Sequence, residues 1–227
     1  MILCCLTAAL FAMTTHGEAG ATAFPCSTPL DAEGFPPLSA WQAVPALSFD
    51  WDWQGRNVDP ERATKVRLLW TPQTLFLRFE ARYRELSVFS DSEPSGRRDQ
   101  LWDRDVVEVF LQPDDSDPWV YKEIEIAPNG MWLDLNVNHR AISDLHSKLR
   151  RRVAIARSAH VWTAEVAIPI LALTGAFDPS KSWQVNFFRV EGAAEPRFYS
   201  AWRPTHTPEP NFHVPEAFGH LSFAPKP

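Results

Sequence analysis

The sequence predicts an all-β fold, an antiparallel two-sheet β-sandwich of jelly-roll character. At least six runs alternate apolar and polar residues with a period of two, which marks strands with one buried face. Turns rich in Pro, Gly and Asn separate these runs, and no segment sustains the 3.6-residue period of a helix. We therefore expect under a tenth of the residues in helices, and 227 residues suit one domain with its own core.

The clearest strands are expected in the middle of the chain, at Val106–Gln112, Tyr121–Ala127 and Met131–Val137. In the first strand the odd-numbered residues form the apolar face, and Glu108 lies on the other face. In the second, Glu123 and Glu125 share a face with Tyr121, and we expect both carboxylates to point into solvent. The Asn-Gly pair before the third strand favours a tight turn, because it readily adopts positive φ.

The remaining strands are expected at Lys65–Trp70, Leu75–Arg84, Arg152–Ala156, Val161–Ile168, Trp183–Glu191 and His220–Phe223. Pro169–Leu173 is expected to form one helical turn. Tryptophans in strands, such as Trp162, are expected in the core.

The N-terminus has the pattern of an export signal. Ile2–Met13 is an apolar run of suitable length, and Ala21-Thr22-Ala23 is a small-residue cleavage motif. The sequence therefore divides into a signal peptide (1–23), an irregular N-terminal segment (24–37) and a single β-sandwich domain (38–227). We expect a secreted or periplasmic protein without membrane insertion, whose only remaining cysteine is Cys26. The net charge of −6 gives no general attraction to nucleic acid.

An indole stands beside fixed charges where the first middle strand begins. Trp102 precedes Asp103, Arg104, Asp105 and Glu108. An aromatic ring can cover the C–H face of a sugar, and carboxylates can accept hydrogen bonds from its hydroxyl groups. This pattern favours a sugar-binding surface at the mouth of a sheet.

Three motifs carry a resemblance to a known family: WDRDVVEVFLQP, EIEIAPNGMW, and VNFFRVE…FYSAWRPT…FHVPEAFGHLSF. Over residues 38–224 the chain resembles the family 9 carbohydrate-binding modules, β-sandwich domains attached to secreted xylanases and similar enzymes. In that family two tryptophans clamp a terminal sugar. The resemblance assigns one wall to Trp102, a sugar-binding carboxylate to Glu108, and the second wall to Trp202. Arg189 and Asn186 could reach the same pocket. Alternatively, Arg189 could be a member of a buried ion pair, and Asn186 could be an amide that hydrogen-bonds the backbone of the strand ladder.

An acidic loop is the candidate metal site. Asp114, Asp115 and Asp117 offer the hard oxygen ligands that Ca²⁺ takes, and relatives in the family carry structural calcium. The alternative is an acidic surface turn, because the spacing is not that of an EF-hand. No cofactor is required by this interpretation.

Three function classes remain. The first is a monomeric, non-catalytic binder of oligo- or polysaccharide that supports polysaccharide breakdown or uptake. The second is a glycoside hydrolase or a protein associated with one, although the sequence singles out no pair of catalytic carboxylates. The third is a haem-binding electron carrier, with Met131 and one of His139, His206 or His213 as axial ligands.

Overall fold

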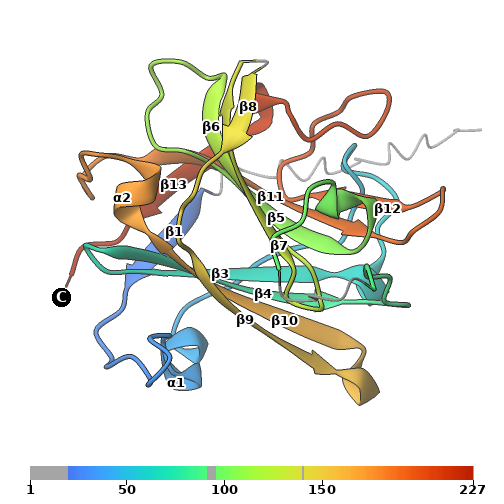
Figure 1. Ribbon diagram of the computed structural model, residues 1–227, viewed down its shortest axis with the longest axis horizontal. Helices are drawn as coiled ribbons and strands as arrows, with labels where there is room; N and C mark the ends of the chain where they lie inside the picture. The colour runs from blue at the N-terminus through green and yellow to red at the C-terminus, as the bar shows by residue number, and fades with distance from the viewer. Residues whose placement is uncertain (1–19, 91–95, 140, 227) are drawn as a thin grey trace, which may run out of the picture.

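Two β-sheets pack face to face in the computed structural model, which describes residues 20–90, 96–139 and 141–226 (Figure 1). Sheet A has the order β8 (Ala141–Asp144), β7 (Trp132–Asn138), β6 (Val120–Ile126), β5 (Val106–Gln112), β11 (Trp183–Glu191), β13 (Gly219–Phe223), with β12 (Phe198–Ala201) also on β11. Sheet B has the order β3 (Thr64–Trp70), β4 (Thr74–Arg82), β10 (Val161–Pro169), β9 (Arg150–Ala156), with β2 (Leu47–Phe49) also on β3. The predicted two-sheet β-sandwich is confirmed.

Strand β1 (Ala21–Pro25) joins the two sheets. Its first three residues pair with β13 of sheet A, and Phe24 and Pro25 pair with β3 of sheet B. Both pairings are parallel, whereas the other pairings between the named strands are antiparallel. The sandwich is therefore mixed at this one strand, which the expectation of a purely antiparallel fold did not include.

The strands expected from alternation all form, within one or two residues of their predicted bounds. The predicted helical turn is α2 (Ile170–Leu173), and the sequence did not indicate α1 (Leu38–Gln42), β1, β2, β8 or β12. These elements have five residues or fewer, too short for a period to show. The 3₁₀ turns are η1 (Pro60–Arg62), η2 (Leu101–Asp103), η3 (Arg157–Ala159) and η4 (Pro215–Ala217).

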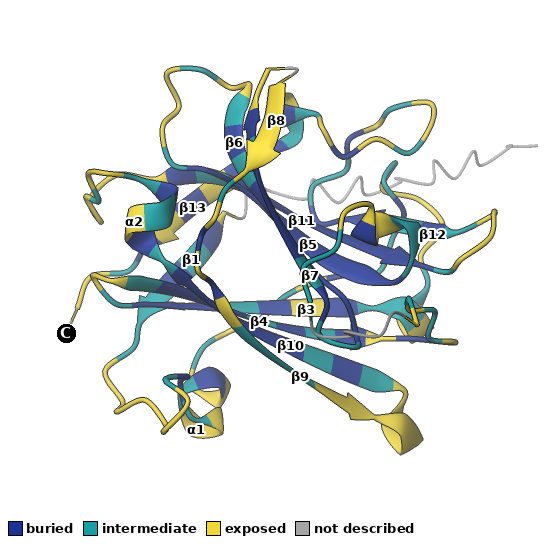
Figure 2. Cartoon of the chain, in the orientation of Figure 1, coloured by how far each residue is buried: buried dark blue, intermediate teal, exposed yellow. Residues whose placement is uncertain are grey.

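Sheet A is covered on both faces. Its inner face meets sheet B, where Val107, Val109 and Phe187 pack with Leu77 and Phe79 in the largest apolar cluster. Its outer face carries a second cluster, which lies beneath the chain that follows β12. Every residue of β5 is buried as a result, and Figure 2 shows this continuous burial along β5 and β11.

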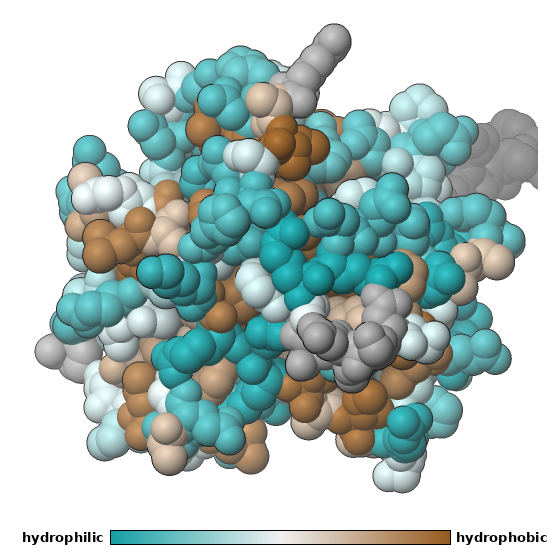
Figure 3. Space-filling view, in the orientation of Figure 1, coloured by the Kyte–Doolittle hydropathy of each residue, from teal (hydrophilic) through white to brown (hydrophobic). Residues whose placement is uncertain are grey.

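The outer face of sheet B is covered by the N-terminal segment. Trp41 of α1 is 1% exposed and packs with Phe35, Leu69 and Phe76 in a third, smaller cluster. Trp162, expected in the core, is fully buried on the other side of sheet B. The surface seen in Figure 3 is mostly hydrophilic with scattered apolar patches, because most large apolar side chains lie inside the three clusters.

The predicted cleavage motif lies inside β1. Ala21 and Ala23 are fully buried, and Thr22 points outward toward Ser222 of β13. Cleavage after Ala23 would remove three of the five residues of this strand. The rest of the predicted signal peptide, residues 1–19, lies outside the described residues. In the ranges that the structure covers, no helix is both long and apolar enough to cross a membrane.

We predict that a chain beginning at Gly20 is more stable than one beginning at Phe24. The shorter chain loses the β1–β13 ladder and two buried methyl groups, at about 0.8 kcal/mol per buried carbon and ~1 kcal/mol per hydrogen bond. We expect a melting temperature roughly 7–14 °C lower for the shorter chain, at about 2–4 °C per kcal/mol for a domain of this size, measured by circular dichroism. Equal melting temperatures would show that residues 20–23 contribute nothing to the sandwich.

Candidate functional site

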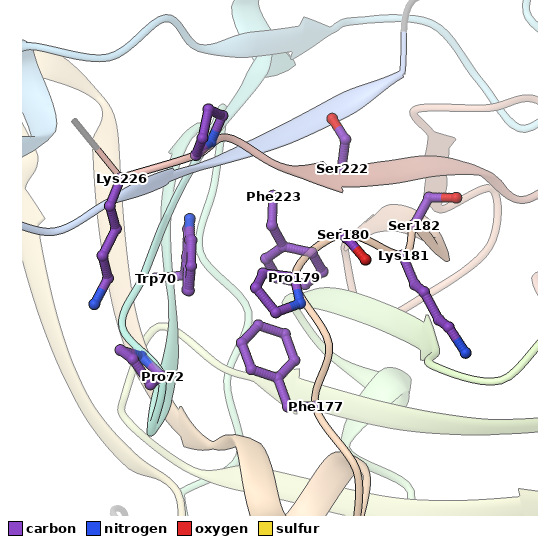
Figure 4. A pocket seen from close by; sticks show the side chains of 11 residues that line it. Trp70, Pro72, Phe177, Pro179, Ser180, Lys181, Ser182, Ser222, Phe223 and Lys226 are labelled. Atoms are coloured by element: carbon purple, nitrogen blue, oxygen red, sulfur yellow. The ribbon is translucent and has the colours of Figure 1, made fainter.

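Two pockets among the described residues bear on the search for a binding site. One, of about 880 Å³, lies beside the end of β3 and is built around Trp70, Phe177 and Phe223. Figure 4 shows these rings meeting at its centre, with the Lys181 side chain directed away from them. Nζ of Lys226 lies 5.8 Å from the centroid of the Trp70 ring. The other, of about 220 Å³, lies over the outer face of sheet A, and we call it the outer-face pocket. It is the candidate site, because the predicted residues Trp102 and Glu108 both line it.

Three carboxyl side chains lie together on this face of sheet A, and two of them, Glu108 and Glu123, line the outer-face pocket. Glu108 on β5 lies opposite Glu125 on β6 in the ladder, and Phe110 lies opposite Glu123. All three glutamates project from the outer face, because even-numbered residues of β5 and odd-numbered residues of β6 share it. Glu108 and Glu123 are each 3% exposed, and Glu125 is fully buried. We call Glu108, Glu123 and Glu125 the carboxyl cluster.

The expectation that Glu123 and Glu125 point into solvent is wrong. The chain after β12 covers this face: Phe212 stacks on Phe188 with ring centroids 4.3 Å apart, and Phe218 meets Tyr121 edge to face. A period of two assigns residues to faces but does not show whether the second face is covered. One signal was present, since the supposed polar face also carries Phe110 and Tyr121.

Burial favours the protonated forms of the carboxyl cluster, because it raises all three pKa values. Burial raises the pKa of Glu108 well above its usual range, and the nearby charge of Glu123 raises it further. Burial raises the pKa of Glu123 to about 7, while contact with the Glu125 carboxyl lowers it. The pKa of Glu125 is raised well above its usual range, mainly by burial and then by Glu108 and Glu123. Ionising all three groups together would place like charges side by side out of water.

Two of these groups line the pocket, and each has a buried oxygen with unused hydrogen-bonding capacity. Oε1 of Glu108 and Oε2 of Glu123 have no hydrogen-bond partner among the residues that the structure describes. Buried polar atoms in folded proteins nearly always have a partner, and an exception needs an explanation. A ligand that donates hydrogen bonds to these oxygens would supply the missing partners.

Aromatic rings form part of the pocket wall beside aliphatic side chains. Trp102 in η2 is 39% exposed, and its backbone carbonyl accepts a hydrogen bond of 2.8 Å from Nη1 of Arg197. The guanidinium of Arg197 lies 4.9 Å from the ring centroid of Tyr199, which lines the pocket too. Nδ1 of His213 lies 2.7 Å from the Tyr121 hydroxyl, and burial lowers the pKa of His213, so this ring is neutral at pH 7. The remaining lining residues include Phe110, Leu135, Ile142, Val190, Pro210, Asn211 and Phe212.

Trp202 lies elsewhere. It is 7% exposed and belongs to the inner core, where its ring centroid is 5.5 Å from that of Phe187. It also lies against Gly219, where an added Cβ would come within 2.9 Å of the indole. Trp202 does not line the outer-face pocket, so the structure does not bring it together with Trp102.

Arg189 and Asn186 have partners inside the protein. Arg189 is fully buried on the inner face, with Nη2 3.2 Å from the Glu191 carboxylate and 3.8 Å from that of Asp105. Asn186 donates from Nδ2 to the Arg203 carbonyl at 2.9 Å, and its Oδ1 accepts from two backbone N–H groups. Neither side chain lines the outer-face pocket. Arg189 is therefore a member of a buried ion pair, and Asn186 is an amide that hydrogen-bonds backbone groups, which are the alternative roles expected for them.

Two of the three aspartates of the acidic loop accept hydrogen bonds from nearby residues of the protein. Asp114 accepts from the Ser116 N–H at 2.9 Å, Asp117 accepts from the Trp119 N–H at 3.0 Å, and Asp117 also meets Nε2 of His139 at 2.9 Å. Within the described ranges, no group of three or more His, Cys, Asp or Glu side chains could hold a metal ion. Asp114, Asp115 and Asp117 therefore do not form a fitted calcium site, and calcium binding stays a prediction from the resemblance.

The proposed haem ligands are not gathered at the pocket. Met131 is 1% exposed within the outer cluster of sheet A, and it does not line the pocket, whereas His213 does. His139 and His206 do not line it either.

Comparison with known proteins gives three likenesses. The family model described as "Carbohydrate-binding family 9" matches residues 41–223. A protein named "Extracellular protein" from Arthroderma benhamiae is 29% identical over 221 residues, covering 89% of this chain and 96% of that protein. Structures of a carbohydrate binding module family 9 from Caldicellulosiruptor kristjanssonii, in complex with glucose and with cellotriose, have TM-scores of 0.61 and 0.64. They are 14% and 15% identical to this chain, and each comparison covers 91% of it and 97% or 94% of the solved chain.

We predict that stability falls as pH rises from 5 to 8, because of the carboxyl cluster. The pKa of Glu123 is raised from 4.5 to about 7, so between these values the folded chain binds more protons than the unfolded chain. Glu123→Gln removes this titration and should raise the free energy of unfolding at pH 8 by roughly 1–3 kcal/mol, at about 1.4 kcal/mol per pKa unit. Urea unfolding at pH 5, 6, 7 and 8 measures this free energy of unfolding for the wild type and the variant.

The matched control is Glu85→Gln, since Glu85 is exposed. It should follow the wild-type pH dependence. The lowered pKa of His213 makes stability rise with pH below its usual value of 6.5, which opposes the effect of Glu123. The test is therefore the difference in free energy of unfolding between the wild type and Glu123→Gln at each pH. If that difference is the same at every pH, Glu123 does not titrate as a buried group.

Proposed function

Because this chain belongs to carbohydrate-binding family 9, we propose that it is a secreted, non-catalytic carbohydrate-binding protein whose ligand occupies the outer-face pocket. The observation that carries the proposal is the combination of an exposed indole with buried carboxyl oxygens that lack partners, Trp102 beside Glu108 and Glu123. A pyranose ring has one apolar face and a rim of hydroxyl groups, so this combination complements both parts.

Each pocket residue has a role that follows from its chemistry. The Trp102 indole covers the apolar face of the sugar, with a contribution of about 1–3 kcal/mol for a well-buried contact. Oε1 of Glu108 and Oε2 of Glu123 accept hydrogen bonds from sugar hydroxyl groups, since no described residue donates to these two oxygens. We assign the opposite wall to Tyr199 and Phe212, aromatic residues of the same pocket, rather than to a second tryptophan.

The relatives support this function and location. The Caldicellulosiruptor kristjanssonii module is solved with glucose and with cellotriose, which are neutral sugars. The Arthroderma benhamiae relative is named an extracellular protein, in agreement with the apolar run at Ile2–Met13. We propose that this chain acts outside the cytoplasm as a monomer and supports polysaccharide breakdown or uptake by holding a sugar.

We predict opposite outcomes for two tryptophan substitutions. Trp102→Ala should weaken cellotriose binding at least about tenfold, or 1.4 kcal/mol, because the stacking surface is lost. Its melting temperature should stay within a few degrees of wild type, since Trp102 is partly exposed. Trp202→Ala should cost about 3–5 kcal/mol of stability by leaving a cavity in the inner core. Calorimetric titration and thermal unfolding measure the two effects, and an unfolded Trp102→Ala protein would make Trp102 a packing residue.

We predict that oligosaccharides are bound and released unchanged. Cellotriose should bind with a dissociation constant between micromolar and millimolar, and Glu108→Gln should weaken it roughly tenfold, because an amide group replaces an acceptor oxygen. Chromatography of cellotriose after a day with the wild type should show no shorter products. Products that disappear with Glu108→Gln would instead establish a glycoside hydrolase, the second function class, since Glu108 and Glu123 share the pocket.

A further inference from the structure

We propose that the outer-face pocket selects amino sugars, whose free ammonium group contacts the carboxyl cluster, and that it rejects uronic acids. This inference rests on the proposed function, because it names the ligand class of the same pocket. Its starting point is an imbalance between acidic and basic side chains: three carboxyl groups are buried side by side on β5 and β6, and Glu108 and Glu123 line the pocket.

The lining of the pocket holds no fixed positive charge. Its polar residues are Trp102, Glu108, Glu123, Tyr199, Asn211 and His213, with no Lys or Arg among the described residues that line it. His213 is neutral at pH 7, because burial lowers its pKa. The acidic groups therefore lack the cation that buried carboxylates normally require.

The arginines near the pocket are engaged elsewhere. Arg197 donates from Nε to the Glu195 carboxylate at 2.9 Å and from Nη1 to the Trp102 carbonyl. Arg104 donates to the Asp103 carbonyl at 2.7 Å and lies over the Phe89 ring. Arg189 is on the other face of sheet A with Asp105 and Glu191. A cation for the carboxyl cluster must then come from the ligand.

An ammonium group suits this cluster better than a metal ion. A calcium ion takes six to eight oxygen ligands, and no described group of three or more acidic, His or Cys side chains could hold a metal ion. An ammonium group needs only two or three acceptors, and each N–H···O⁻ contact is a charge-assisted hydrogen bond. Oε1 of Glu108 and Oε2 of Glu123 are acceptors without a partner. A uronate would bring a carboxylate into a pocket whose described lining has no Lys or Arg to pair with it, and burying an unpaired charge is costly.

Binding of an ammonium should release protons. The titratable groups that face the pocket are Glu108, Tyr121, Glu123, Glu125, Tyr199 and His213. Burial raises the pKa of Tyr199 to about 12 and that of Tyr121 further, so neither phenol titrates near neutral pH. A cation beside Glu108 and Glu123 favours their ionised forms and so lowers pKa values that burial has raised. A neutral sugar has no such effect.

The test is calorimetric titration at pH 6.5 with glucosamine, glucose, N-acetylglucosamine and glucuronate, in two buffers of different ionisation enthalpy. We expect glucosamine to bind at least about tenfold more tightly than glucose and to release protons, since a charge-assisted contact replaces a neutral one. N-acetylglucosamine, whose amide carries no charge, should show no preference over glucose, and glucuronate should not bind measurably.

Glu123→Gln is the informative variant, because it keeps the shape of the side chain and removes one acidic group. It should reduce the preference for glucosamine over glucose several-fold and reduce proton release, whereas the exposed Glu85→Gln should change neither. Equal binding of glucosamine and glucose without proton release would overturn this inference and leave carbohydrate binding intact. Glucuronate binding as tight as that of glucosamine would also overturn it. If none of these sugars nor cellotriose binds, the proposed function itself fails.

Discussion

The covering of sheet A on both faces is the constraint from which the candidate site follows. Sheet B removes the inner face from water, and the chain from Trp202 to Phe218 removes most of the outer face. Any acid on β5 or β6 is then taken out of water whichever way it points, so it must find a partner or keep a proton. The outer-face pocket lies where this second cover is incomplete, which places buried acids within reach of a ligand.

Arg189 and Glu108 are two buried ionisable side chains on adjacent strands, and their surroundings differ. Both lie on adjacent strands of sheet A, and both are almost completely buried. Arg189 is surrounded by the Glu191 and Asp105 carboxylates and by the Val106 carbonyl, so its charge is balanced internally. Glu108 has the like charge of Glu123 nearby instead, and one of its oxygens has no partner. The first arrangement stabilises a core, and the second leaves interactions for a ligand.

The sequence predicted the strands and their faces well, because alternation is a local property. It failed where the outcome depended on distant chain: Glu123 and Glu125 are buried by Phe212 and Phe218, which lie almost ninety residues further on. Trp102 and Glu108 were placed correctly in one pocket, since they are six residues apart on one strand and its preceding turn. Trp202 sits among polar residues in the sequence, but its backbone N–H donates to the Phe187 carbonyl at 2.8 Å, and its ring lies in the inner core.

The pairing of β1 with β13 has a consequence for how the chain folds. Thr22 and Ser222 are 200 positions apart, and their strands are neighbours in sheet A. Contacts of such long range close large loops before they return any stabilisation, and proteins rich in them fold in milliseconds to seconds rather than microseconds. During synthesis β1 must wait for β13, so the sandwich closes only after the 200 positions that separate Thr22 from Ser222 have been made.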